Sequence, residues 1–166
     1  MRHIISILLE NESGALSRVS GLFSARAYNI ESLTVAPTDD PTMSRITVVA
    51  YGNDAVIRQI TQQLNKLVDV VMLDDLTGDR HIEREIMLLK IEVSSAVEDA
   101  FSKAVDETGA QCIDVVDGIH IVQITDTGSR LDEALKTFSC CSVVEVVRSG
   151  AVGIGCGAEV LKLKLG

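Results

Sequence analysis

The feature that most constrains this chain is the order in which its hydrophobic periodicity changes along the first half of the sequence. Apolar residues follow the pattern of strands in four segments and the spacing of a helix face in two others. The segments are a strand at 4–9, a helix from about 14, strands at 30–35 and 44–51, a helix over 56–67 and a strand at 68–73. This βαββαβ order predicts a ferredoxin-like α+β fold, with both helices on one face of an antiparallel sheet. The other face of such a sheet needs a partner.

The same order recurs in the second half, so the sequence predicts two tandem ferredoxin-like domains. Strands are expected near 86–93, 111–116, 119–125 and 143–147, and helices near 97–108 and 131–138. Asp117-Gly118, between the two middle strands, is a strong signal for a two-residue hairpin turn. We predict domains at 1–76 and 82–150, a polar linker at 77–81, and a glycine-rich tail at 151–166 that is mobile unless a partner holds it.

Composition limits the partners and the compartment that we expect. The formal net charge of -9 repels nucleic-acid phosphates and anionic lipid headgroups, so we expect neither a nucleic acid nor a membrane as partner. The first apolar run is too short for a signal peptide or a membrane span. The four cysteines have no CxxC spacing, which favours a reduced, cytoplasmic protein.

The most informative candidate site is the turn between the first strand and the first helix. A helix that starts at Gly14 or Ala15 has free N–H groups and a partial positive charge at its first turn, which can hold a carboxylate. Gly14 lets a ligand approach the backbone, and the side chain of Asn11 offers both a donor and an acceptor. The alternative, which spacing alone favours, is that Ser13 only caps the helix and Gly14 only eases the turn.

A second candidate is Asn29, which precedes the strand that begins at Ile30. Asn29 could contact a ligand, or it could end the first helix in the left-handed conformation that asparagine tolerates. Both roles remain open from the sequence.

No catalytic or metal-binding group of residues is recognisable. His3, His81 and His120 lack metal-ligand spacing, and no Cys, Ser or Lys lies in a nucleophile motif. We therefore predict that the chain holds no cofactor and no metal, and that it is not a catalyst by itself.

Two segments carry a specific family resemblance. Residues 7–19 (ILLENESGALSRV) and 28–39 (YNIESLTVAPTD) closely resemble the small subunits of acetolactate synthase, also called acetohydroxyacid synthase. The resemblance continues at 64–70, 83–90 and 144–150 and is looser between 93 and 141. Family members often have Gly at the position of Ala27, so Asn29 would take the left-handed position here.

The resemblance implies that the N-terminal domain is an ACT domain, a module that binds an amino-acid effector between the two copies of a homodimer. Asn11 and the helix start at Gly14, Ala15 and Leu16 would hold the polar groups of a branched-chain amino acid, usually valine. Asn29 and Ile30 would come from the opposite protomer.

The resemblance also implies a regulatory, non-catalytic subunit in branched-chain amino-acid biosynthesis. Its C-terminal domain would bind and activate the large catalytic subunit, which condenses two pyruvates and carries thiamine diphosphate, Mg²⁺ and FAD. The alternatives are a stand-alone ACT-type regulator of another enzyme or of transcription, and a ferredoxin-like enzyme that acts alone.

Overall fold

The computed structural model describes residues 1–25, 28–158 and 160–161. The chain forms two compact units, an N-terminal unit of Met1–Ile82 joined by the segment from Ala151 onward, and a C-terminal unit of Glu83–Gly150. Each unit has the βαββαβ order and an antiparallel sheet, which confirms the predicted fold class.

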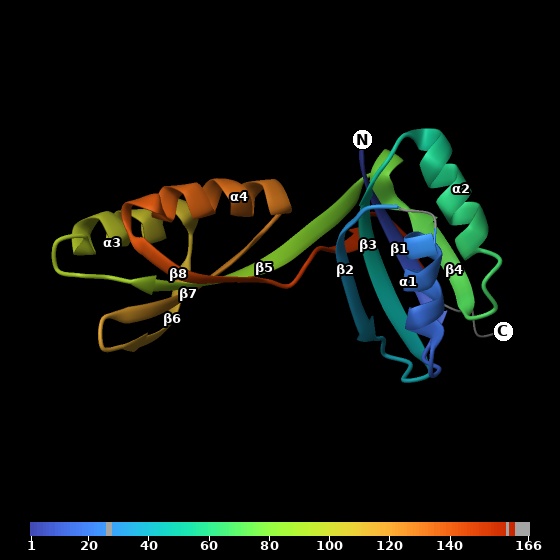
Figure 1. Cartoon of the computed structure of the whole chain (residues 1–166), viewed down its shortest axis with the longest axis horizontal. Coiled ribbons are helices and arrows are strands. Elements are labelled where there is room, and N and C mark those ends of the chain that lie inside the picture. The colour runs from blue at the N-terminus through green and yellow to red at the C-terminus, as the bar shows by residue number, and fades with distance from the viewer. Residues whose placement is uncertain (26–27, 159, 162–166) are drawn as a thin grey trace. The chain divides into compact units, whose positions relative to one another are not determined.

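The N-terminal unit has a four-stranded sheet in the order β2-β3-β1-β4, with α1 and α2 on one face (Figure 1). Its core lies between that face and the two helices, and contains Val19 and Phe23 of α1 and Ile57 and Ile60 of α2. The elements are β1 (Arg2–Glu10), α1 (Ala15–Ala25), β2 (Ile30–Pro37), β3 (Met43–Tyr51), α2 (Asp54–Leu64), β4 (Val70–Asp75) and the short 3₁₀ helix η1 (Leu76–Gly78).

The central strand β1 is buried on both faces. Ile5 and Ile7 face the helices and are 0% exposed, while Ile4 and Leu8 face the other way and are only 2% and 3% exposed. A strand covered on both sides has no need of polar residues on alternate positions. This explains why the sequence at 4–9 is a nearly continuous apolar run.

The second face of this sheet is covered in part by the end of the chain itself, which corrects the prediction of a mobile tail for residues 151 to 155. Strand β9 (Val152–Gly155) pairs with β5, and the Cys156 amide donates to the carbonyl of Arg80. Ala151 packs with Ile4 in a second buried cluster. The segment can lie so close because Gly153 has no Cβ: one built there would be 2.8 Å from Ile4 Cδ1.

The predicted linker at 77–81 is also ordered, and the division between units falls after it, between Ile82 and Glu83. Leu76 is 2% exposed and packs in the same buried cluster, so this segment has an apolar anchor. Asp75 caps η1 by accepting from the Thr77 amide at 3.1 Å. Strand β5 begins at His81 and continues through the division, so the first connection between the units is a strand and not a loop.

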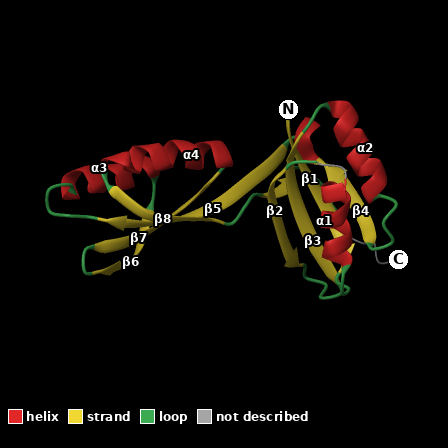
Figure 2. Ribbon diagram, viewed as in Figure 1, coloured by secondary structure: helices red, strands yellow, loops and turns green. Residues whose placement is uncertain are grey.

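The C-terminal unit repeats the architecture, with α3 and α4 on one face of a sheet ordered β6-β7-β5-β8 (Figure 2). The Asp117-Gly118 turn is confirmed, since both residues have positive φ, 50° and 80°. Met87 and Leu89 of β5 are buried against Phe101 of α3 and Leu131 of α4. The elements are β5 (His81–Glu92), α3 (Glu98–Thr108), β6 (Gln111–Val116), β7 (Ile119–Asp126), α4 (Gly128–Thr137), the 3₁₀ helix η2 (Phe138–Cys140) and β8 (Ser142–Arg148).

Candidate functional site

Asn11 lies at the end of β1, exposed, where the chain turns toward α1. Its backbone amide donates to the Thr42 carbonyl at 2.7 Å, and its Nδ2 donates to the Pro41 carbonyl at 3.0 Å. These bonds tie Asn11 to the β2–β3 loop and orient its amide group. The carbonyl oxygen Oδ1 can then accept from the ammonium group of a ligand.

Gly14 forms the start of α1. Its φ is +85°, and its carbonyl accepts the first helical hydrogen bond, from the amide of Arg18 at 3.0 Å. Ser13 does not cap this helix, since its hydroxyl makes no hydrogen bond to the helix in the part of the chain that the structure describes. At the helix start Gly14 and Leu16 are exposed, and Ala15 between them is buried.

An ion pair that the sequence reasoning missed lies beside this helix start. Arg18 donates from Nε and Nη2 to the two carboxylate oxygens of Asp69, both at 2.6 Å, and Asp69 is 4% exposed. A Cβ on Gly14 would be 3.0 Å from Arg18 Nη1. Arg18 thus places a guanidinium next to the position where a carboxylate would meet the helix.

The paired charges shift each other's titration. The hydrogen bonds from Arg18 lower the pKa of Asp69, and those same bonds raise the pKa of Arg18. No local pattern indicated this pair, because its members are 51 positions apart in the sequence.

Asn29 and Ile30 lie at the opposite end of the same sheet. The register aligns Ile30 with Ala50 and Ala50 with His3. At the other end, Leu9, two residues before Asn11, aligns with Ser44, and Ser44 aligns with Pro37. The eight residues of β2 span roughly 26 Å at 3.3 Å per residue. One protomer therefore does not bring the two groups of predicted residues together.

The left-handed conformation expected for Asn29 is wrong, since among the described non-glycine residues Asp117 alone has positive φ. The helix instead closes through a hydrogen bond from the Tyr28 amide to the Phe23 carbonyl at 3.1 Å. Ala27, on which that expectation depended, lies outside the described residues.

Exposed apolar side chains lie near the Asn11 end of the sheet, at its β2 edge. Leu33 of β2 packs into the helix-side core, so Val35, two residues on, faces the same side. Val35 is 41% exposed and Leu16, in the first turn of α1, is 39% exposed. Val35 on the edge strand and Leu16 at the helix start are thus apolar side chains open to solvent, of a kind that suits an aliphatic group.

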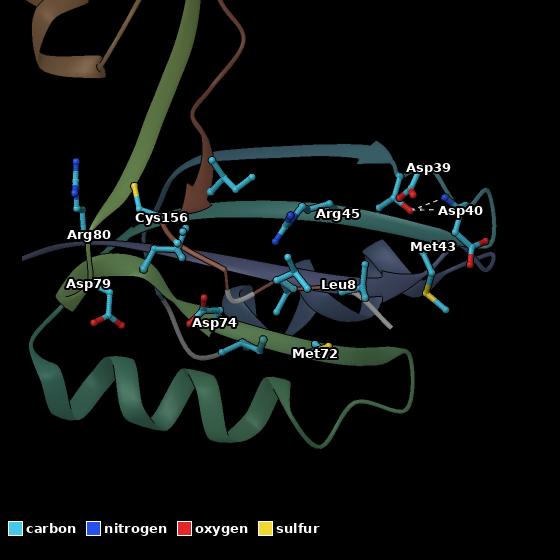
Figure 3. Close-up of a pocket in the computed structure, with 18 of the residues that line it drawn as sticks. Leu8, Asp39, Asp40, Met43, Arg45, Met72, Asp74, Asp79, Arg80 and Cys156 are labelled. Carbon is cyan, nitrogen blue, oxygen red and sulfur yellow. Dashed lines mark hydrogen bonds between the residues drawn. The ribbon is translucent and has the colours of Figure 1, made fainter. Parts of the chain in front are cut away.

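A large cleft lies elsewhere in the N-terminal unit, on the sheet face opposite the helices (Figure 3). Its volume is about 1030 Å³, and Leu8, Met43 and Met72 contribute apolar walls. Arg45 donates from Nε to Ser6 Oγ at 2.9 Å, and burial lowers its pKa against the opposing effect of Asp74. None of the six predicted effector residues lines this cleft.

The contacts of His120 and Cys141 do not indicate a catalytic site. His120 lies against the Phe101 ring at 4.7 Å, and burial raises the pKa of the Cys141 thiol to about 11, which keeps it protonated. Among the described residues, no group of three or more His, Cys, Asp or Glu side chains could hold a metal ion. No helix in the described ranges is long and apolar enough to cross a membrane.

Comparison with known families gives a match over each unit. Residues 5–72 match the family of AHAS small subunit-like ACT domains, and residues 84–157 match the family described as the small subunit of acetolactate synthase. The second match includes β9, so this strand belongs to the shared family pattern.

Individual relatives cover nearly the full chain. The acetolactate synthase isozyme 3 small subunit of Escherichia coli is 50% identical over 98% of this chain and 100% of its own length. The acetolactate synthase small subunit of Mycolicibacterium smegmatis is 34% identical, with 93% and 91% covered. The crystal structure of the small subunit from Thermotoga maritima superimposes with a TM-score of 0.85 at 30% identity, over 96% of this chain and 99% of that one.

Proposed function

This chain belongs to the family of acetolactate synthase small subunits, and we propose that it regulates a large catalytic subunit by binding a branched-chain amino acid, valine in the first instance. Effector binding would lower catalytic activity as feedback inhibition, while association of the small subunit would raise it. Such coupling requires that the effector binds better to one arrangement of the assembly than to another.

The observation that carries the proposal is the exposed helix start between Asn11 and Leu16. A carboxylate there would meet the first N–H groups of α1, beside the guanidinium of Arg18, which is itself paired with Asp69. The ammonium group would bond Asn11 Oδ1, and the aliphatic side chain would lie against Leu16 and Val35. These contacts match the three parts of valine.

One protomer supplies only half of the effector site. An antiparallel pairing of the β2 strands of two protomers would complete it. β2 is an edge strand of the sheet, and its Asn29 end is far from its own Asn11. A two-fold axis across this edge reverses the second strand, so Asn29 and Ile30 of the second copy come to the end where Asn11 lies. We therefore propose a homodimer with two effector sites at its interface.

The proposal leaves the condensation of two pyruvates to the catalytic subunit. Thiamine diphosphate, Mg²⁺ and FAD would be bound by that subunit and not by this chain. The C-terminal unit would make the activating contact, and the complex would work in the cytoplasm. A stand-alone ACT regulator is less favoured, because the family match extends over both units.

Isothermal titration of the full chain with valine, leucine and isoleucine tests the sensing function. We expect saturable heat with at least valine, and one bound ligand per chain. One methylene alters binding by only about 1 to 3 kcal/mol in an apolar pocket, so leucine and isoleucine are expected to bind within about 200-fold of valine. No heat with any of the three, on a folded dimer, would contradict the proposal.

Gly14→Asp is predicted to abolish feedback inhibition in the complex with the large subunit while sparing activation. The new carboxylate would pair with Arg18 and repel that of valine. We expect the concentration of valine needed for half inhibition to rise at least about tenfold, a typical allosteric coupling.

Gly14→Asn is the matched control for this variant. Asparagine has nearly the same shape and also tolerates the φ of +85° that Gly14 adopts, but it carries no charge. We expect it to retain more valine sensitivity than the aspartate variant. Equal valine inhibition in wild type and Gly14→Asp would refute the placement of the carboxylate.

A further inference from the structure

The helix-free face of the N-terminal sheet, opposite α1 and α2, is covered by β9 over only part of its area. β9 lies against the part around Ile4, since a Cβ on Gly153 would be 2.8 Å from the Ile4 side chain. Leu8 lies four residues further along β1, and the register places Arg45 and Met72 beside it on β3 and β4. The cleft of about 1030 Å³ lies over this second part of the face (Figure 3).

Apolar side chains in the wall of this cleft are open to solvent. Met72 is 36% exposed, Ile154 of β9 is 57% exposed and Val160 is 64% exposed, and all three line the cleft. Removing apolar surface from water stabilises a protein by about 25 cal/mol per Å². The wall therefore favours an occupant that brings apolar side chains of its own.

The cleft also carries an excess of negative charge. Its lining includes four carboxylates and two guanidinium groups, which belong to Asp39, Asp40, Asp74, Asp79, Arg45 and Arg80. Such a balance attracts a cationic occupant and repels a phosphate or a fatty acid.

Arg45 offers hydrogen-bond donors on the floor of the cleft. Its Nε donates to Oγ of Ser6 at 2.9 Å, and Ser6 is 0% exposed, so the guanidinium has a fixed anchor. Among the described residues this is the one hydrogen bond of the Arg45 side chain, which leaves both Nη groups for an occupant. Backbone carbonyl oxygens of an extended peptide would accept from them.

The size of the cleft favours a peptide over a single amino acid. Small-molecule pockets have volumes of about 300 to 1,000 Å³, and this cleft lies at the upper limit of that range. An amino acid would leave most of it empty. The walls, the charge and the size together suit a short peptide in which apolar and basic residues alternate.

The chain itself continues with such a sequence. Val160 and Leu161 line the cleft, so the chain reaches it at this point. Residues 162–166, which lie outside the described residues, have the sequence Lys-Leu-Lys-Leu-Gly. In an extended segment, this alternation places the leucines on the side of Leu161 and the lysines on the other side. Five residues at about 3.3 Å each would span roughly 16 Å.

We propose that residues 162–166 dock in this cleft as an extended segment and complete the cover of the helix-free face. The two leucines would lie against Met72 and Ile154, and the two lysines would pair with carboxylates such as that of Asp74. Arg45 would donate to the backbone of the segment. The proposal does not depend on the proposed effector site, because none of the effector residues lines this cleft.

The four methionines of the chain allow a direct test in the full-length protein. Met43 and Met72 line the cleft, whereas Met1 is 73% exposed and Met87 is 0% exposed. Hydrogen peroxide converts an accessible methionine to its sulfoxide faster than a covered one. The rate at each methionine is measured by mass spectrometry, and Met1 and Met87 serve as the exposed and buried references within the same molecule.

The double variant Lys162→Glu and Lys164→Glu reverses the charge of the segment toward the acidic cleft. We expect oxidation of the two cleft methionines to become about threefold faster or more, with both references unchanged. Leu163→Asp combined with Leu165→Asp should have the same effect by removing the apolar contacts. The matched control, Lys162→Arg and Lys164→Arg, keeps the positive charge and should leave all four rates within about 1.5-fold of wild type.

Three outcomes would overturn the proposal. The first is an equal rate at the cleft methionines in the wild type and in both disruptive variants. The second is protection that disappears on dilution, which would mean that the segment docks in a second copy. The third is rapid oxidation in the free wild-type chain that slows only when the large subunit is added, which would assign the cleft to that subunit. None of these outcomes bears on valine binding, so the proposed function is tested separately.

Discussion

The two units have the same topology but differ in how far the helix-free face of each sheet is buried. In the N-terminal unit, β1 is buried on both faces, whereas in β5 of the C-terminal unit burial alternates from Ile86 to Leu89. The outer strands differ more, since every residue of β6 is exposed. A βαββαβ fold buries one sheet face against its helices and leaves the other to be covered by something else. The N-terminal unit covers that face with its own chain, and the C-terminal unit leaves it open.

Each unit also fixes helix and sheet with one arginine and one buried carboxylate. Arg18 of α1 pairs with Asp69 before β4, and Arg148 of β8 donates from Nε and Nη2 to Glu85, each bond 2.9 Å long. Arg148 also donates to Asp132 of α4 at 2.6 Å. Both units thus have an arginine–carboxylate pair on the helix side of the sheet, and they differ in the cover of the other face.

The largest expected effect separates the two helix-free faces directly. Val49→Asp would put a carboxylate where the side chain is 0% exposed and has only apolar neighbours in its cluster, which should cost about 3 to 5 kcal/mol of unfolding free energy. Val147→Asp should cost less than about 1 kcal/mol, because the aspartate would remain in water. Urea unfolding of both variants measures the difference. If both variants lost the same unfolding free energy, the difference in exposure between the two faces would not affect stability.

A smaller effect is expected from filling the contact between β9 and the sheet. A Cβ in Gly153→Ala would be 2.8 Å from Ile4 and 3.0 Å from Leu76, and both side chains are only 2% exposed, with little room to move. We expect a loss of about 1 to 2 kcal/mol by overpacking. Gly155→Ala is the matched control, because its nearest neighbour would be 3.7 Å away, and its effect should stay within about 0.5 kcal/mol.

A stable Gly153→Ala variant in urea unfolding would mean that β9 can detach from the sheet without loss. The covered face of the N-terminal unit would then be no better covered than that of the C-terminal unit.

Local patterns in the sequence were sufficient for the elements and for one turn. Helical and strand periodicity predicted all eight strands and four helices of the two βαββαβ units. The ends of these elements differ from the prediction by a few residues, as in β1 and α2, and the Asp117-Gly118 turn was correct. Val68 was assigned to the fourth strand, but β4 begins at Val70 and Val68 is 86% exposed. A run of apolar residues does not show which of its ends the tertiary fold will bury.

The contacts that depend on distant residues could not be predicted from such patterns. β9 is a strand only because Gly153 fits against Ile4 and Leu76, and a glycine-rich segment by itself indicates a loop. The pairing of Arg18 with Asp69 follows from the packing of α1 beside β4, which no local pattern around either residue indicates. For the candidate site, the residues near Asn11 and Gly14 could be named from the sequence, but their separation from Asn29 needed the register.

The smallest effect concerns the ion pair of the N-terminal unit and depends on pH. Because the pKa of Asp69 is lowered in the folded state, its contribution to stability is full above the ordinary aspartate pKa of about 3.9 and is lost as the pH falls through the lower folded value. Asp69→Asn should therefore be less stable than wild type at pH 7, and the gap should narrow below about pH 4. Urea unfolding from pH 7 to pH 3, with Arg18→Met and the double variant, isolates the pair. A gap that stays constant down to pH 3 would mean that Asp69 acts through its shape or its backbone and not through its charge, and the two units would then differ on the helix side as well.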